Sequence, residues 1–304
     1  MEAVFLKLLN MSITAGWVVL VIVVLRQVLK RAPKSMVCFL WAFVALRLLC
    51  PISVESVLSL IPSAETVPQD IMYHQNPQIH SGILMLNTTI NPILSEGMSP
   101  APGDSVNPMQ VVISIVSRIW IMGMLGMVLY AVVSYYKIHK QVAVSLKLED
   151  KLYVCDDIES PFILGIMRPR IYLPSSLEEE KQLYVIAHEK AHLKRRDHWW
   201  KPVGFLLLTV YWFHPLMWLA YVLLCRDIEL ACDEKVIKEL GEAQKRPYSE
   251  ALLYCSVPRR RIVACPLAFG EVGVKERVKS VLHYKKPAFW VIMTTVLVCV
   301  IVAV

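Results

Sequence analysis

Residues 187–192 read Ala-His-Glu-Lys-Ala-His, so two histidines stand four positions apart with a glutamate directly after the first. Positions i and i+4 of a helix share one face, so His188 and His192 can offer two imidazole nitrogens to one metal ion. Glu189 is rotated off that face, where it can reach a metal-bound water and act as a general base. The pattern is short, and a surface helix with two unrelated histidines also fits it.

The flanking residues predict that this segment is helical. Ser176 and Glu179 have the spacing of a capping box, which predicts the start of the helix. Acidic residues fill the first predicted turn and the basic residues Lys194 to Arg196 fill the last one, as the helix dipole favours.

A second pair of candidate residues follows about forty positions later, in the stretch CRDIELACDEKVIKEL. Glu229 is a suitable third ligand, because two neutral imidazoles, one carboxylate and one water make an open tetrahedral zinc site. Asp233, one turn later, could accept a hydrogen bond from the free ring N–H of a ligand histidine. An ordinary acidic helix face explains these two residues taken alone, but the combination with the histidine pair favours a metal site. For the neighbouring Cys232 we favour a buried apolar role.

The composition indicates an integral membrane protein. Of 304 residues, 56% are hydrophobic, and the mean hydropathy is +0.50. Each of four apolar runs approaches the roughly 20 residues that a membrane-spanning helix needs: they cover about 4–25, 36–52, 111–136 and 287–304. The first run lacks a basic leader and a small-residue cleavage site, so it does not read as a removable signal peptide. The eight cysteines form no CxxC pair, and we expect no structural disulfide.

The distribution of basic residues predicts the orientation in the membrane. The loop between the first two runs carries Arg26, Lys30, Arg31 and Lys34, whereas residues 53–110 contain no lysine or arginine. The positive-inside rule therefore places the N-terminus and the 53–110 loop, which we expect to be irregular, outside the cell. Residues 137–286 are then cytoplasmic. The net charge of +7 suits a domain beside an anionic inner leaflet, and no motif indicates direct nucleic-acid binding.

One further apolar stretch, residues 201–225, is predicted not to cross the membrane. Both of its flanks are basic, and Pro215 interrupts it in the middle. Proline fits the first turn of a helix better than its interior. We therefore expect two helices, about 202–213 and 215–240, whose apolar hairpin (202–225) is either buried or dipped into the membrane. If the stretch did cross, Glu229 would lie outside, and a transporter or channel that uses the histidines for ions would be the better reading.

The ordered motifs resemble those of the BlaR/MecR-type membrane metallopeptidases, the antirepressor signal transducers of bacteria. The likeness covers most of the chain, and His214 departs from it, since the family usually has asparagine before the proline. The matching stretches are SPFILGIMRPRIYLP (160–174), HEKAHLKRRD (188–197), WFHPLMW (212–218), ELACDEKV (229–236) and LAFGEVGVKERVKSVLHYKKPAFW (267–290).

The resemblance implies a gluzincin-like zinc protease, with His188, His192 and Glu229 as Zn²⁺ ligands, Glu189 as the base and Asp233 as the family's supporting aspartate. It also implies that LYVCDD (152–157) and FILGIMRPRIYL (162–173) form strands of a small sheet beside the HExxH helix. An edge strand there could pair with an extended substrate. The strand-forming residues of these stretches, together with Gly165 and two prolines as turn and edge signals, agree with this expectation.

In this family the signal is transmitted by proteolysis of a cytoplasmic repressor and often of the sensor itself. The segment 263–271, and most narrowly 265–270, is a candidate self-cleavage loop, although a structural loop fits equally well. A penicillin-binding sensor domain follows the last span in antibiotic sensors, and the sequence here ends at Val304 within an apolar run. We therefore expect a chain shortened before any sensor domain, or one without such a domain.

Taken together, the sequence predicts an α+β integral membrane protein of the bacterial plasma membrane. Residues 1–136 form a membrane region with three helices, residues 137–286 a cytoplasmic zinc metalloprotease domain, and residues 287–304 a fourth span. We expect a signal-transducing protease that responds to a cell-envelope or β-lactam signal. Its expected partners are the lipid bilayer and a repressor-like substrate, and we allow for a homodimer. The alternative is a membrane sensor or scaffold with an idle zinc site.

Overall fold

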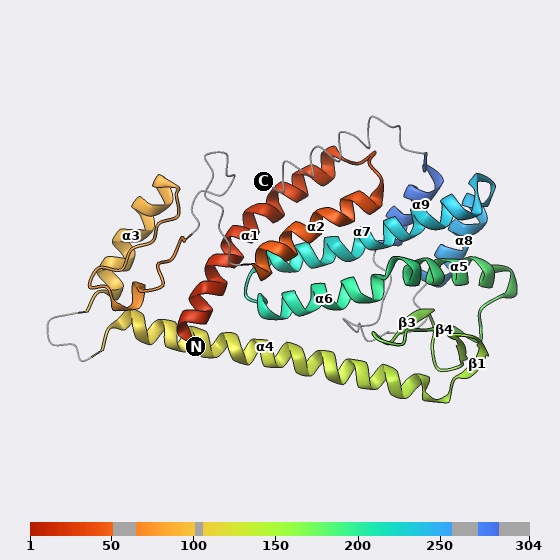
Figure 1. Ribbon diagram of the computed structural model, residues 1–304, viewed down its shortest axis with the longest axis horizontal. Coiled ribbons are helices and arrows are strands. Elements are labelled where there is room, and N and C mark those ends of the chain that lie inside the picture. Colours follow the sequence, from red (N-terminus) through yellow and green to blue (C-terminus); the bar gives the residue numbers. More distant parts are fainter. Residues whose placement is uncertain (51–64, 101–105, 257–272, 286–304) are drawn as a thin grey trace.

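The computed structural model describes residues 1–50, 65–100, 106–256 and 273–285, which are mostly helical and include one small sheet (Figure 1). The α-helices are α1 (Glu2–Val28), α2 (Lys34–Leu49), α3 (Leu84–Met98), α4 (Pro108–Gln141), α5 (Glu179–Arg195), α6 (Asp197–Val210), α7 (Pro215–Leu240), α8 (Lys245–Ser256) and α9 (Val274–Leu282). Three short 3-10 helices are η1 (Ile71–Tyr73), η2 (Val142–Val144) and η3 (Glu242–Gln244).

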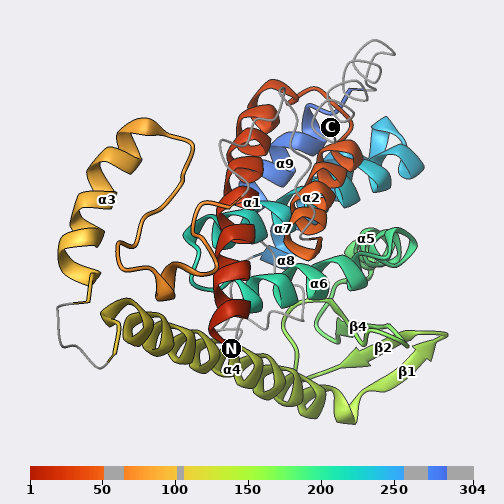
Figure 2. The same cartoon turned by 60° about the vertical axis from the view of Figure 1, so that its left-hand side comes forward.

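Helices α1, α2, α6 and α7 share the largest apolar core, which the long helix α4 borders on one side (Figures 1 and 2). The sheet and helices α5, α8 and α9 lie beyond one end of this bundle, and α3 lies beyond the other end. The core is built from side chains such as Val19 and Ile22 of α1, Leu40 and Trp41 of α2, and Leu208 of α6. The six cysteines in the described part of the chain are free thiols.

Within the described residues, two helices are long and apolar enough to cross a membrane: α1, and the stretch Pro108–Val144 that contains α4. They contain the predicted spans 4–25 and 111–136. The predicted span 36–52 corresponds to α2, whose 16 residues extend only about 24 Å at 1.5 Å per residue. That length is less than the hydrocarbon core of roughly 30 Å. The fourth predicted span, 287–304, lies outside the described residues.

The sheet has four strands in the order β1-β2-β4-β3, with β2 and β4 parallel and the other pairs antiparallel. The strands are β1 (Leu146–Glu149), β2 (Leu152–Cys155), β3 (Phe162–Leu164) and β4 (Arg170–Pro174). The strands predicted in 152–157 and 162–173 are confirmed, whereas β1 was not predicted because its exposed residues show no alternation. Gly165 ends β3 at φ +103°, and an added Cβ would lie 2.7 Å from the Arg168 carbonyl oxygen, so the turn requires glycine there.

Two local expectations were wrong. The 53–110 segment is not wholly irregular, because η1 and α3 lie within it, and apolar side chains of α3 such as Leu94 and Met98 pack beside Ile71 and Met72. The capping box at Ser176 does not form either. The Leu177 amide donates to the Pro174 carbonyl in a turn, so α5 begins two residues later than predicted, at Glu179, with Glu178 as its N-cap.

Helices α6 and α7 correspond to the two helices predicted around the apolar stretch. α6 begins earlier than expected, at Asp197, because Arg196 takes a left-handed conformation (φ 60°) that ends α5 and starts the next helix. Pro215 is the first residue of α7, as predicted. His214, which departs from the family pattern, makes no side-chain cap and lies against Gly16 of α1. The two helices lie side by side, so α7 runs back toward α5 (Figure 1).

Candidate metal centre

Helix α5 presents both histidines of the HExxH motif on its buried face. The Nε2 atoms of His188 and His192 are 3.1 Å apart, and both rings are buried. The face is buried because α5 packs against α7 and α8, with Ala191 and Val185 contributing apolar contacts. The i, i+4 spacing therefore brings the two imidazoles together as the sequence predicts.

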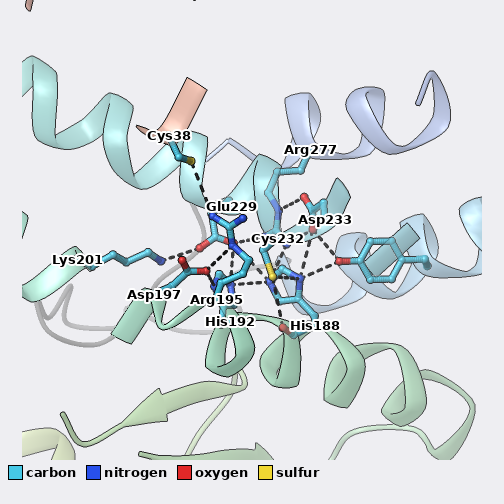
Figure 3. Close-up of polar contacts among 11 residues, drawn as sticks. Cys38, His188, His192, Arg195, Asp197, Lys201, Glu229, Cys232, Asp233 and Arg277 are labelled. Atoms are coloured by element: carbon cyan, nitrogen blue, oxygen red, sulfur yellow. Dashed lines mark hydrogen bonds and ion pairs between the residues drawn. The ribbon is translucent and has the colours of Figure 1, made fainter. Parts of the chain in front are cut away.

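Helix α7 brings Glu229 to the same point (Figure 3). Its Oε2 atom lies 3.4 Å from Nε2 of His188 and 3.6 Å from Nε2 of His192. Ligand atoms about 2.0–2.1 Å from a tetrahedral zinc ion are about 3.4 Å apart, so the three atoms have the separations that zinc requires. The set of two imidazole nitrogens and one carboxylate oxygen is also the donor chemistry of open zinc sites.

The second oxygen of Glu229 is held by a lysine that the sequence did not reveal. Lys201 of α6 is buried, and its Nζ donates to Glu229 Oε1 over 2.7 Å. Burial alone would raise the pKa of Glu229, but the positive charge of Lys201, together with His192 and Arg277, outweighs it and holds that pKa well below its usual range. The carboxylate is thus ionised, with Oε1 engaged and Oε2 facing the two histidines.

Asp197 orients the second histidine. Its Oδ2 atom accepts hydrogen bonds from Nδ1 of His192 at 2.8 Å and from Nε of Arg195 at 3.0 Å. A donor at Nδ1 leaves the lone pair of Nε2 free for a metal, which is the usual role of such a carboxylate. Asp197 was missed as a functional residue, although it is the last residue of the motif HEKAHLKRRD. The turn at Arg196 that folds it back has no strong sequence signal.

Asp233 supports the first histidine, but through a tyrosine. Nδ1 of His188 lies 2.8 Å from the Tyr248 hydroxyl, which donates to Asp233 Oδ1 over 2.7 Å. Since the hydroxyl hydrogen points to the carboxylate, the His188 Nδ1–H is the donor to the tyrosine oxygen. Nδ1 and Asp233 Oδ1 are also only 3.3 Å apart. The predicted pairing of Asp233 with a ligand histidine therefore exists, with Tyr248 of α8 inserted between them.

Arg277 of α9 completes the polar shell. It is 1% exposed, and its Nε and Nη2 atoms donate to the two oxygens of Asp233 at 2.9 Å each. Its Nη1 atom lies 3.4 Å from Glu229 Oε2, and its Nη2 atom lies 3.1 Å from Nε2 of His188. Burial opposes ionisation of Asp233, but Arg277 outweighs it and lowers the pKa of that carboxyl. Arg277 was not predicted as a site residue, because the stretch VKERVKSVL has the pattern of a charged surface helix.

Cys232 offers a different ligand set. Its thiol and ring nitrogens of His188 and His192 lie within 4.8 Å of one another, and it is fully buried. However, its sulfur approaches the Nδ1 atom of His188 at 3.6 Å and the backbone carbonyl of His188 at 3.4 Å. Nδ1 of His188 already has Tyr248 as its partner. Glu229, in contrast, faces the Nε2 atoms of both histidines, so the geometry favours Glu229 over Cys232 as the third ligand.

Glu189 lies beside these residues and lines a small cavity together with both histidines and Glu229. The cavity volume is about 40 Å³, more than the roughly 10–15 Å³ that one water needs. Ser160 and Pro161, directly before the edge strand β3, form part of its wall. The predicted base therefore faces a space that can hold a water.

An HExxH helix, a carboxylate from a second helix and supporting aspartates form the kind of centre that zinc-dependent peptidases use. The chain belongs to the BlaR1 peptidase M56 family, whose sequence model matches residues 6–281.

Among curated proteins, the methicillin resistance mecR1 protein of Staphylococcus aureus and that of Staphylococcus epidermidis are each 26% identical to it over 193 residues, which cover 55% of this chain and 33% of the relative. The regulatory protein BlaR1 of Bacillus licheniformis is 27% identical over 194 residues, which cover 55% and 32%. The aligned part thus spans about one third of these relatives.

Proposed function

We propose that this protein is a membrane-embedded zinc metalloprotease that acts as a signal transducer. It cleaves a cytoplasmic repressor, itself or both in response to an extracellular cell-envelope or β-lactam signal. The observation that carries the proposal is the triangle of His188 Nε2, His192 Nε2 and Glu229 Oε2, with sides of 3.1, 3.4 and 3.6 Å, beside Glu189. The names of the relatives, which refer to regulation and methicillin resistance, support the signalling part.

In this proposal His188, His192 and Glu229 hold the zinc ion and Glu189 performs the proton transfers. When bound, the ion would polarise a water and the scissile carbonyl. Glu189 accepts a proton from the water and later passes it to the leaving amine. Asp197 and Tyr248 keep both imidazoles in the tautomer that has no proton on Nε2, the atom that would hold the metal.

We place residues 137–286 in the cytoplasm as the protease domain, with the N-terminus and residues 53–110 outside. The basic loop after α1 and the absence of lysine and arginine from 53–110 support this orientation. Four spans, at about 4–25, 36–52, 111–136 and 287–304, complete the proposal. The return of α7 toward α5 supports the view that the apolar hairpin 202–225 does not cross.

The edge strand β3 is the proposed docking site for substrate. It lies at the end of the sheet, and the residues before it line the cavity that contains Glu189. An extended peptide paired with β3 would run past the metal centre. Since the cavity is small, about 40 Å³, and α8 and Arg277 form part of its wall, we propose that this wall moves when a peptide enters. A closed resting state suits a protease that cuts only after a signal.

Metal analysis and proteolysis together test this function. The wild type, Glu229→Ala and Glu189→Ala are purified in detergent, dialysed and analysed for zinc per chain. We expect near one zinc in the wild type and in Glu189→Ala, and a large loss in Glu229→Ala. Equal zinc in the wild type and Glu229→Ala would remove Glu229 from the ligand set.

The signalling response separates a protease from a sensor with an idle zinc site. We expect Glu189→Ala to abolish cleavage of the repressor and the downstream response. A full response in that variant would support the non-proteolytic alternative. Mass spectrometry of the membrane protein checks for a cut within 263–271, a segment outside the described residues. Labelling at Lys235 from outside the cell would contradict the cytoplasmic placement and favour a transporter.

A further inference from the structure

Helix α7 carries acidic side chains on two different faces. Asp227 and Glu234 are seven residues apart, which is close to two helical turns, so they lie on one face. Glu229 and Asp233 are four residues apart and share a second face. Asp227 and Glu229 are separated by about 200° around the helix axis. The two faces therefore have different partners, and all four side chains are buried.

Asp227 binds the helical hairpin formed by α1 and α2, which we call the α1–α2 hairpin. Arg26, near the end of α1, donates from Nε to Oδ2 at 2.8 Å and from Nη2 to Oδ1 at 2.6 Å. Trp41 of α2 donates its indole N–H to Oδ2 at 2.8 Å. A two-pronged arginine–carboxylate contact fixes orientation as well as distance. Asp227 is 2% exposed, so this anchor is shielded from water and counterions.

Glu234 binds the same hairpin two turns further along α7. Its Oε2 atom accepts from the backbone N–H of Lys34, the first residue of α2, over 2.7 Å. The N-cap of α2 is Pro33, which has no side-chain acceptor for this amide. The carboxylate of Glu234 therefore caps α2 from outside and faces the positive end of its dipole.

These contacts place α7 between the α1–α2 hairpin and the histidine helix α5. We propose that Asp227 and Glu234 are positioning residues through which the hairpin sets the place of Glu229 in the metal centre. This inference rests on the proposed zinc-protease function. Since Asp227 precedes Glu229 by only two residues on a continuous helix, a shift of the hairpin displaces Glu229 relative to both histidines. Zinc affinity then depends on the position of α1 and α2, the first two proposed spans, so a signal that moves these helices would reach the metal centre directly.

Zinc affinity in matched variants tests this proposal. Asp227→Asn keeps the shape of the side chain but removes its charge. It also places an NH2 group where one of the donors, Arg26 or Trp41, needs an acceptor. Arg26→Gln removes the partner, and Arg31→Gln changes an exposed arginine five residues later as the control. For the full chain in detergent, we expect the zinc dissociation constant to rise about 2- to 30-fold in each of the first two variants and to stay unchanged in the control. The double variant should bind zinc no more weakly than Asp227→Asn does, because both changes break the same Arg26–Asp227 contact.

A purely structural role would give a different result. It would lower the melting temperature of the metal-free protein and leave the zinc affinity of the folded fraction within twofold of the wild type, which would overturn the proposal. Amide hydrogen exchange in the presence of EDTA supplies a readout without metal. Faster exchange around Glu229 in Asp227→Asn than in Arg31→Gln supports the proposal, and equal exchange overturns it. A wild type that binds no zinc would refute the proposed function, while the exchange result would still decide this inference.

Discussion

Removal of the Asp197 carboxylate should weaken metal binding without removing any ligand. Its Oδ2 atom holds Nδ1 of His192 at 2.8 Å and Nε of Arg195 at 3.0 Å, in a buried position. In Asp197→Ala the ring is free to rotate and to place its proton on Nε2, the atom that faces Glu229. Each such event removes one ligand from the centre.

The size of the effect follows from the role of the contact. Loss of a hydrogen-bond partner behind a ligand histidine costs about 10- to 100-fold in metal affinity, or about 1.4–2.7 kcal/mol. Asp197→Asn retains an oxygen that can accept from Nδ1 of His192, so we expect a loss below about tenfold. The order wild type, asparagine, alanine therefore separates the hydrogen bond from the charge.

The assay is competition between the protein and a chromophoric zinc chelator, with Asp157→Ala as the control. Asp157 is an exposed aspartate in the turn after β2, away from the centre. Zinc affinity in Asp197→Ala within about threefold of the wild type would refute the reasoning, because the imidazole would then be held by packing alone. Equal losses in Asp197→Ala and Asp157→Ala would also refute it.

Three further outcomes follow from the same shell. Tyr248→Phe should weaken zinc binding less than Asp197→Ala does, because Asp233 lies close enough to accept directly from the ligand histidine; the same competition assay checks this order. Lys201→Met should cost the metal-free protein about 3 kcal/mol, since Glu229 becomes a buried charge without its lysine, and equal melting of variant and wild type in EDTA would contradict this. Metal-free protein should lose stability as the pH falls below about 4, since the lowered folded pKa of Asp233 gives a stabilisation that is present above the unfolded pKa and is lost as the pH falls through the folded pKa. Arg277→Gln should reduce this dependence of stability on pH, measured as the melting temperature at several pH values.

The sequence predicted the parts of the centre that depend on local periodicity. The spacing of His188 and His192 needs only a helix, and their shared face follows from it. Glu229 lies beside the two histidines because α7 begins at Pro215 and returns toward α5, and its role as a ligand stays a prediction. The number of membrane spans stays a prediction, since two of the four predicted spans lie in helices long and apolar enough to cross a membrane.

The residues of the centre that the sequence did not predict were all missed for one physical reason. Lys201, Tyr248 and Arg277 meet the centre across 28, 60 and 89 positions of sequence, and only the packing of α6, α8 and α9 brings them there. Lysine and arginine are almost never buried unless paired, so a sequence pattern assigns them to solvent. Their partners are acidic residues of α7. The burial of these side chains can therefore be explained only when both members of each pair are considered.

This pairing has a consequence for metal removal. Each of three buried carboxylates near the ligands has a cation beside it: Asp197 with Arg195, Glu229 with Lys201, and Asp233 with Arg277. The charges of these three carboxylates are therefore balanced by the protein alone, unlike in small zinc domains whose ligands cannot fold without the ion. We expect EDTA-treated protein to keep its helical circular dichroism and a cooperative melting transition, and to recover zinc when it is added back. Unfolding on zinc removal would show that the cations do not compensate the carboxylates, whereas retained structure would leave zinc loading free to serve as a regulated step.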